Sequence, residues 1–475
     1  MQIDPVIIEY ISAVPEIVLL LGACIVLLAG AFMPLKSHWT FVLTQAVLWA
    51  TLYLCARPFT GQAIELFNGF YIDDDLSVLA KSSMCVFMIV VMLYSRGFIN
   101  RHDYPRGEYY ALALFSLLGM MLISSANHLL MVYLGLELLS LSMYALVAMN
   151  RDNSVSSEAA IKYFVLGAIA SGFLLYGISL LYGLTGTLYL SDLSVENEMG
   201  IGIITAVIFI VIGLAFKLGA VPFHMWLPDV YQGAPLPVTL LIASVPKIAG
   251  LLLALRLLMD GLQYMHEYWQ QSLIVLALLS LTAGNIIAIS QSNLRRMLGY
   301  STIGHVGYIL LGLLIGDSTG YSAALFYTLT YALMSSAVFG ILLCAERMNH
   351  RLENLDDLKG LSKPYPWLAF LMLLLMFSMA GIPMTVGFYA KLNVLQALVA
   401  NGGIGLAIVA VIASVIGAFY YLRVIKLMYF EEGEVIQREV MPTGHISVLS
   451  IHTLLVVGLF LFPQMLIELC RQAIG

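Results

Sequence analysis

The chain alternates long apolar runs with short polar breaks along its whole length. A membrane-spanning helix needs about 20 apolar residues. The runs between breaks predict fourteen such spans, at residues 15–35, 39–56, 76–96, 108–125, 128–149, 159–183, 201–221, 237–258, 271–290, 297–316, 321–345, 366–388 with a continuation to 400, 403–430 and 446–470. Because the runs are continuous rather than alternating, they favour helices over a β-barrel. The pattern therefore predicts an all-α polytopic membrane protein.

The basic residues between the spans predict an orientation. Connections after even-numbered spans hold only Arg57, Arg256 and Arg471. Connections after odd-numbered spans hold Lys36, Arg96, Arg101, Arg106, Arg151, Arg295, Arg296, Arg347, Arg351, Lys359, Lys363, Arg423, Lys426 and Arg438. Since cytoplasmic loops are enriched in lysine and arginine, we expect the odd connections in the cytoplasm and both termini on the opposite side of the membrane.

Composition narrows the function classes. Hydrophobic residues make up 61% of the 475 residues, and charged residues only 11%, against about a quarter in soluble domains. The net charge is −6, so neither a soluble enzyme nor a nucleic-acid binder is expected. The five cysteines are scattered, and no nucleotide-binding motif is present, so we expect no cofactor and no metal in this chain.

Five lysines fall inside predicted spans, and a charge at a helix centre costs about 2.5–3.5 kcal/mol or more. Lys81 and Lys162 lie near span ends, where the ammonium can reach the interface, whereas Lys217, Lys247 and Lys391 lie deeper. Two interpretations remain open for the deep lysines. They are paired structural charges, or they form a proton path.

The proton-path interpretation rests on reversible charge. A buried ammonium releases its proton readily when it lacks a counter-charge, and a nearby carboxylate stabilises the charged form. Glu137 is the only carboxylate near the middle of a predicted span. Water, tyrosine and histidine connect such groups into relays. The candidate connecting residues are His224, His305, Tyr300 and Tyr308, and His305 is the strongest because it lies mid-span.

Two predicted spans are interrupted by glycine and proline. The seventh runs into a segment with Pro222, Pro228, Pro235 and Pro237, and the twelfth contains Gly381 to Pro383. Proline breaks or kinks a helix. Interruptions at membrane depth are tolerated where they face protein or water, and they often mark ion pathways. We therefore expect a broken helix in each place, with simple proline kinks as the alternative.

Weak similarities recur at a nearly constant offset. Phe216 and Pro222 recur as Phe377 and Pro383, and residues 134–146 resemble residues 298–310. The offset equals five spans, an odd number, so the second copy would be inverted, as in many transporters. We expect N-terminal spans 1–3 at residues 1–107, inverted repeats at 108–258 (spans 4–8) and 271–430 (spans 9–13), and a final span at 446–475.

These motifs carry a resemblance over nearly the whole chain. They are LGLELLSLSMYALVA, SSEAAIKYFVLGAIASGFLLYG, FKLGAVPFHMWLPDVYQGAPLPVT, VPKIAG, NLRRMLGYSTIGHVGYIL and AGIPMTVGFYAKL. The sequence resembles the antiporter-like membrane subunits of respiratory complex I, and among them the N-type subunits of bacterial NADH:quinone oxidoreductases. The resemblance implies proton translocation in the inner membrane, next to other antiporter-like and small membrane subunits. It places FMN, iron–sulfur clusters and quinone in partner subunits.

The resemblance also implies roles for individual residues. Glu137 and Lys217 match the family's glutamate–lysine pair, Lys247 its central lysine, and Lys391 its terminal charged residue. His305 occupies a site where relatives carry a titratable group. Lys162, His224 and Tyr300 are secondary candidates.

Two alternative functions remain open at this point. One is a cation/proton antiporter subunit without a redox partner, and the other is a spacer whose charges only hold helices together. The charged connection at residues 346–363 is expected to lie on the cytoplasmic surface. It would be either a solvated loop or a docking site.

Overall fold

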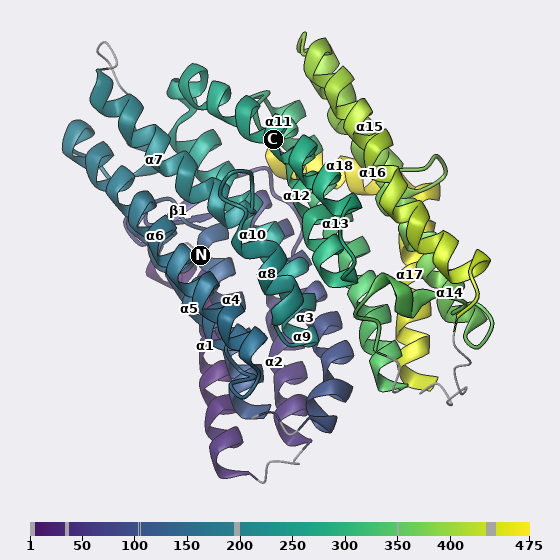
Figure 1. Cartoon of the computed structure of the whole chain (residues 1–475). Coiled ribbons are helices and arrows are strands. Elements are labelled where there is room, and N and C mark those ends of the chain that lie inside the picture. The colour runs from purple at the N-terminus through teal and green to yellow at the C-terminus, as the bar shows by residue number, and fades with distance from the viewer. Residues whose placement is uncertain are drawn as a thin grey trace. The chain divides into compact units, whose positions relative to one another are not determined.

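The structure is a computed structural model. It describes residues 5–33, 38–102, 104, 106–193, 200–348, 351–433 and 443–475, with side chains described from residue 11 onward and, after the last gap, from residue 444 onward. Lys36, Arg438 and part of the 346–363 connection lie outside the described residues. The chain is helical almost throughout, which confirms the predicted all-α class (Figure 1).

The helices follow the predicted spans closely. The first half contains α1 (Pro5–Phe32), α2 (Trp39–Cys55), α3 (Asp75–Arg101), α4 (Arg106–Ser124), α5 (Leu129–Val147), α6 (Ser154–Thr185), η1 (Leu190–Asp192), α7 (Ile201–Leu218), α8 (Trp226–Gly233), α9 (Leu236–Ala243), α10 (Val245–Leu255), η2 (Arg256–Gly261) and η3 (Gln263–Met265). The second half contains α11 (His266–Ile289), α12 (Leu294–Leu313), α13 (Ser318–Arg347), η4 (Leu355–Leu358), α14 (Pro366–Ala380), α15 (Val386–Ala400), α16 (Ile404–Phe430), α17 (Thr443–Leu461) and α18 (Pro463–Ile474).

Among the described residues, eleven helical segments are long and apolar enough to cross a membrane. The remaining predicted spans correspond to α2, α12 and the pair α14 and α15. The count of fourteen therefore stays a prediction. The last span differs from its prediction, because α17 ends at Leu461 and a separate helix, α18, begins at Pro463.

The first compact unit comprises Met1–Leu214, Val245–Trp269 and Leu469–Gly475. Within it α4 packs against α1, α2, α3, α5 and α10. Gly30 of α1 faces Gly107 of α4 so closely that a Cβ on Gly30 would lie 2.3 Å from the Gly107 Cα. The two helices can therefore cross at this depth only because neither residue has a side chain.

This unit also contains a small feature that the sequence did not predict. The strands β1 (Ile64–Leu66) and β2 (Tyr71–Asp73) form an antiparallel hairpin between α2 and α3. The hairpin places the Tyr71 hydroxyl 3.1 Å from a Glu16 carboxylate oxygen of α1.

The second compact unit comprises Ala215–Ser244 and Gln270–Glu468. Its centre is α13, which packs against α9, α12, α14, α15 and α17. In the apolar stretch of α13, 94% of the residues are buried. By contrast, α16 exposes apolar side chains such as Val415 (70% exposed) and Phe419 (55%), as expected of a helix that faces lipid.

Both predicted helix breaks are present, and they are built alike. After α7, Gly219 has φ +85°, and the amide of Ala220 donates to the Ala215 carbonyl. After α14, Gly381 has φ +80°, and the amide of Ile382 donates to the Phe377 carbonyl. In each break, the helix ends at a glycine in the left-handed conformation. The amide of the residue after this glycine donates to the carbonyl five residues earlier, which is the pattern of a Schellman cap. The shared local geometry supports the predicted repeat, whose inverted arrangement and residue boundaries stay predictions.

A third interruption was not predicted. The run at 237–258 is divided into α9 and α10 at Ser244, just before Pro246. The Ala243 carbonyl at the end of α9 accepts a hydrogen bond from Ser335 Oγ at 2.9 Å. The interruption is thus stabilised by a side chain of α13, as a break away from water requires.

Candidate functional site

Lys391 is buried on α15 and makes its hydrogen bonds to neutral groups. Its Nζ donates to the Ala380 carbonyl at 2.8 Å and to Ser414 Oγ at 2.9 Å. Nζ also lies 5.4 Å from the centre of the Tyr308 ring. No carboxylate pairs with it among the residues that the structure describes. The Ala380 carbonyl belongs to the last residue of α14, so the ammonium faces the negative end of that helix dipole.

His305 is buried on α12 between two tyrosines. Its Nδ1 lies 2.7 Å from the Tyr327 hydroxyl, and its Nε2 lies 2.9 Å from the Tyr421 hydroxyl. Tyr421 is also bonded to Ser301 Oγ, at 2.5 Å. A neutral imidazole donates from one nitrogen and accepts at the other. The two hydroxyls therefore satisfy both ring nitrogens at once.

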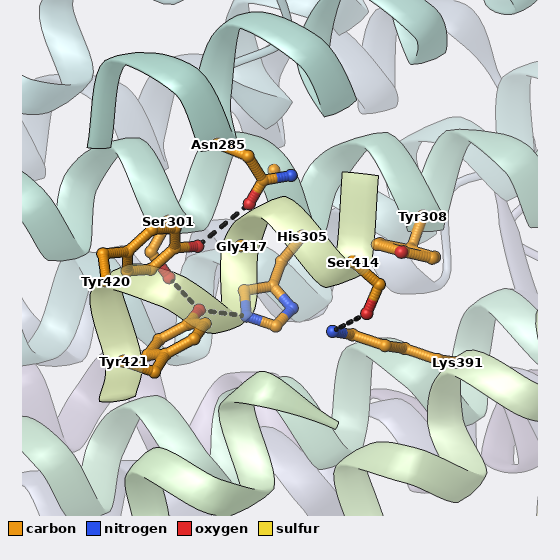
Figure 2. Close-up of a pocket in the computed structure, with 10 residues that line it drawn as sticks. Asn285, Ser301, His305, Tyr308, Lys391, Ser414, Gly417, Tyr420 and Tyr421 are labelled. Carbon is orange, nitrogen blue, oxygen red and sulfur yellow. Dashed lines mark hydrogen bonds between the residues drawn. The ribbon is translucent and has the colours of Figure 1, made fainter. Parts of the chain in front are cut away.

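Lys391 and His305 line the same small cavity, whose volume of about 10 Å³ leaves room for about one water molecule. Figure 2 shows both side chains directed into it, with the Tyr420–Asn285 and Tyr421–Ser301 bonds on one side and Ser414 beside the lysine. Hydroxyl, amide, imidazole and amine groups dominate this lining. A polar cavity of this kind provides the several hydrogen-bonding partners that a buried water molecule needs.

Side chains also donate to carbonyls at the two helix breaks, and the two donors differ in kind. After α7, the Trp226 indole donates to the Phe216 carbonyl at 3.0 Å. After α14, the Lys391 ammonium fills this role at the Ala380 carbonyl. An indole N–H does not titrate near neutral pH, whereas an ammonium can lose its proton. At the second break, the end of a helix is therefore coupled to a group that can change its charge.

The other main candidates are placed as follows. Lys217 lies in the last turn of α7 and is half-buried, and Lys247 lies on α10, 3% exposed. Glu137 lies on α5 and is half-buried, and its Oε1 is buried without a hydrogen-bond partner in the structure. A buried carboxylate oxygen is costly when it lacks a donor, so Glu137 is suited to a water molecule or a cation.

The secondary candidates are less enclosed. Lys162 is 43% exposed and pairs with Glu158 one turn earlier on α6, at 2.7 Å. His224 lies between α7 and α8 with its ring 6.3 Å from that of Tyr300, and its Nδ1 is buried without a hydrogen-bond partner in the structure. Tyr300 also lies beneath the Arg296 guanidinium, at 5.9 Å.

Lys81 differs from its expected position. Sequence position suggested that its ammonium reaches the interface. Instead the side chain is 5% exposed, and Nζ lies 2.6 Å from a Glu16 carboxylate oxygen and 2.6 Å from the Tyr71 hydroxyl. The sequence placed Glu16 at the very start of a span. The hairpin that carries Tyr71 gave no sequence signal.

Arg256 also differs from its prediction, which placed it in a connection between two spans. It is 1% exposed in the wide turn of η2, and it pairs with Asp74 at 2.7 Å and Asp260 at 2.9 Å. Its guanidinium also donates to the Ser124 carbonyl. Asp74 caps α3 just outside the span. Burial raises its pKa, but the charge and hydrogen bond of Arg256 and the hydrogen bonds with Ser77 together lower it below its usual value.

Several residues of the cavity were missed by sequence reasoning. They are Tyr421, Tyr420, Asn285 and Ser414, and Tyr327, which bonds to His305 outside the lining, was missed as well. Their only sequence signal is a polar atom within an apolar run, which many structural residues share. Among the described residues, no group of three or more His, Cys, Asp or Glu could hold a metal ion.

Comparison with known proteins shows which class of membrane protein this fold belongs to. The model of a membrane family described as NADH:quinone oxidoreductase/Mrp antiporter matches residues 126–417, a range that includes both helix breaks, Lys391 and His305. A chain of respiratory complex I from Thermus thermophilus with bound aureothin is 30% identical. It superimposes with a TM-score of 0.82, covering 96% of this chain and 98% of that one.

Curated relatives narrow the class further. A protein of Thioalkalivibrio sulfidiphilus named NADH-quinone oxidoreductase subunit N is 50% identical over 98% of both chains. A protein of the same name from Thiobacillus denitrificans is 48% identical over the same shares. The chain therefore belongs to the family of NADH-quinone oxidoreductase subunit N, which confirms the resemblance drawn from its motifs.

Proposed function

We propose that this chain is a proton-translocating subunit in the membrane arm of a bacterial NADH:quinone oxidoreductase. Its family, its apolar helices and its buried titratable groups support this function. Neighbouring antiporter-like and small membrane subunits are its partners in the inner membrane. FMN, the iron–sulfur clusters and the quinone belong to other subunits of the complex.

The orientation is part of the proposal. Both termini face the periplasm, and the connections rich in lysine and arginine face the cytoplasm. The uneven distribution of basic residues in the sequence supports this assignment.

The proton path runs through Glu137, Lys217, Lys247 and Lys391. His305 acts beside Lys391, while Lys162, His224 and Tyr300 have secondary roles. The observation that carries the proposal is the setting of Lys391, whose ammonium is buried in a polar cavity and held by a carbonyl and a hydroxyl. Because neither acceptor carries a fixed charge, the amine can gain and lose its proton without leaving a buried carboxylate unpaired.

His305 extends the path on the other side of the same cavity. Its ring accepts a proton at one nitrogen and releases one from the other, so a proton passes between the Tyr421 and Tyr327 hydroxyls as the tautomer changes. The other half of the path, at Glu137 and Lys217, is coupled electrostatically to the neighbouring subunit. When a charge moves in a neighbouring subunit, Glu137 gains or loses its hold on Lys217, and the proton of Lys217 moves toward Lys247 and Lys391.

The experiment measures proton uptake per NADH oxidised, with the assembled complex in proteoliposomes. Lys391→Met removes the titratable amine and keeps a long apolar side chain, and Lys217→Ala tests the first half of the path. Lys363→Met is the matched control, because Lys363 is 74% exposed and pairs only with the exposed Glu432 among the described residues.

We expect a several-fold lower proton uptake in the two path variants and unchanged uptake in the control. Full uptake per NADH in normally assembled Lys391→Met and Lys217→Ala complexes would overturn the proposal. The family model also covers Mrp antiporters, which makes a cation/proton antiporter the second candidate. Sodium transport that persists without the redox subunits would favour that function.

A further inference from the structure

A second, larger cavity lies at the C-terminal end of α16. It has a volume of about 500 Å³ and opens to the outside between α16 and the segment 355–362, which begins with η4. The two walls are joined by backbone bonds, since the amide of Gly360 donates to the Leu427 carbonyl at 3.1 Å and the amide of Ser362 to the Met428 carbonyl at 3.3 Å. Leu355, Leu358 and Leu361 of this segment are buried. The leucines of this connection are therefore packed, whereas charged side chains such as Asp356 (79% exposed) and Lys363 (74%) remain in solvent.

Three cations line this cavity, and two of them are paired. Lys359 lies 2.7 Å from Asp356, and Lys426 lies 3.1 Å from Glu431. Arg423 has no carboxylate partner among the described residues, and only its Nη1 is used, for the Ile289 and Gln291 carbonyls at 3.3 and 3.4 Å. The cavity thus carries a net positive charge. The Arg423 guanidinium keeps further N–H donors that can bind a phosphate group.

The position along α16 matches the membrane interface. A helix of 27 residues is about 40 Å long, against about 30 Å for the hydrocarbon core. The ends of α16 therefore leave the core, and Arg423 and Lys426 lie in its last two turns, from which a long basic side chain reaches the interface.

An exposed apolar stripe leads from the core to the same place, through Val411 (48% exposed), Val415 (70%), Phe419 (55%) and Leu422 (44%). Phe419 and Leu422 also line the cavity. The site therefore combines a polar, net cationic end with an apolar track that runs along one helix.

We propose that this cavity binds the headgroup of an anionic phospholipid. The phosphate pairs with Arg423 and is flanked by Lys426 and Lys359, and one acyl chain lies along the Phe419–Val415 stripe. A lipid fits both halves of the site with one molecule, since basic pockets beside membrane helices select anionic headgroups. The inference does not depend on the proton path, because none of these residues belongs to it.

The test uses the assembled complex in phosphatidylcholine nanodiscs containing a photoactivatable phosphatidylglycerol. Cross-linked peptides are mapped and quantified by mass spectrometry. We expect labelling within residues 415–427, with about fivefold weaker labelling for each cation removed. Arg423→Gln removes the unpaired cation. Lys426→Gln is the second variant, because its side chain is 68% exposed and its loss leaves the packing intact.

Lys363→Gln is the control, as a lysine of the same connection that does not line the cavity, and its labelling should be unchanged. Three outcomes would overturn the proposal. They are equal labelling by a photoactivatable phosphatidylcholine, unchanged labelling in both cavity variants, and a cross-link from this cavity to a neighbouring subunit in place of lipid.

Discussion

Two buried lysines show how the neighbouring group decides what an ammonium can do. Lys81 and Lys391 are 4% and 9% exposed. Lys81 is held by the Glu16 carboxylate, so losing its proton would leave a buried negative charge unpaired. Lys391 is held by a carbonyl and a hydroxyl, and its neutral form leaves no such charge. This difference supports the proposal that Lys391 belongs to the proton path, and it indicates that Lys81 is a structural charge.

The Tyr421 hydroxyl is expected to take part in proton transfer, because it is hydrogen-bonded to both His305 and Ser301. Tyr421→Phe leaves the ring in place and removes the hydrogen bond at His305 Nε2. A loss of about 1.4 kcal/mol at that nitrogen slows proton transfer about tenfold. We expect proton uptake per NADH in proteoliposomes to fall accordingly, with normal assembly.

Tyr109→Phe is the matched control for this change. It also removes a buried tyrosine–serine bond, from Tyr109 to Ser95 at 2.9 Å, but Tyr109 does not line the cavity. Equal effects of the two substitutions would mean that the Tyr421 hydroxyl acts only through stability.

At the scale of the element, the break between α14 and α15 (Figure 1) makes the site possible. A continuous helix would use the Ala380 carbonyl for its own backbone bond. The turn after Gly381 leaves that carbonyl available, and the following helix brings Lys391 back to it. The glycine and proline in the sequence thus create an acceptor for the ammonium.

Gly381→Ala tests this element. The residue has φ +80°, and a Cβ would lie 2.8 Å from Lys391 Cδ, so the substitution strains the backbone and displaces the lysine. We expect a loss of about 1 kcal/mol or more in stability together with reduced proton uptake.

Gly186→Ala provides the comparison, since Gly186 has φ +75° at the end of α6 and a Cβ there would meet no atom within 4 Å. That variant should lose stability and retain proton uptake. If Gly381→Ala also retained uptake, the placement of Lys391 by this turn would not matter for transport.

The N-terminal cap of α13, Asp317, contributes to the stability of the folded protein in a pH-dependent way. Asp317 accepts hydrogen bonds from the Gly320 amide and the Thr319 hydroxyl, both at 2.7 Å. Burial raises the pKa of Asp317, but these bonds, together with those from the Asn401 amide and the Thr319 backbone, lower it below the usual value. A carboxylate with a lowered pKa stabilises the folded state above its unfolded pKa, and this contribution is lost as the pH falls through the folded pKa.

Asp317→Ala should therefore cost about 1 kcal/mol at neutral pH. In thermal unfolding of the purified complex, the difference from the parent should shrink below about pH 4. Asn153→Ala removes an amide cap from α6 and should show a difference that does not change with pH. A constant difference for Asp317→Ala as well would contradict the assigned charge state.

At the scale of the whole molecule, buried charges hold the first compact unit together. In the first unit, Arg256 joins the start of α3, the end of α4 and the turn of η2 through Asp74, Ser124 and Asp260. Removing one member of a buried ion pair leaves an unpaired charge and costs about 3–5 kcal/mol. This network is a frame for the unit and not a part of the proton path.

Arg256→Leu should strongly reduce the amount of subunit found in membranes, as measured by quantitative immunoblotting of the complex. Glu158→Leu breaks a different ion pair of the same unit, with Lys162, in which the two side chains are 65% and 43% exposed. Exposed pairs contribute about 0–1 kcal/mol, so this variant should accumulate normally. Equal accumulation of both variants would show that Arg256 is dispensable for folding.

Much of the fold was predictable because hydropathy is a local property. The spans, both glycine–proline breaks and the buried positions of Lys247 and Lys391 follow from runs of neighbouring residues. The hairpin at β1 and β2 and the interruption at Ser244 were missed, since each depends on contacts that a short segment does not reveal.

The sequence alone determined that this is a helical membrane protein, which family it belongs to, and which charges are too deep in the apolar runs to be incidental. Only the tertiary structure decided what each of those charges meets. Lys391 and Ser414 lie on different helices, and His305 and Tyr421 are 116 residues apart. Hydropathy sets the depth of a residue within its own helix, whereas packing between helices selects its partner, and the partner determines whether a buried charge is fixed or can change.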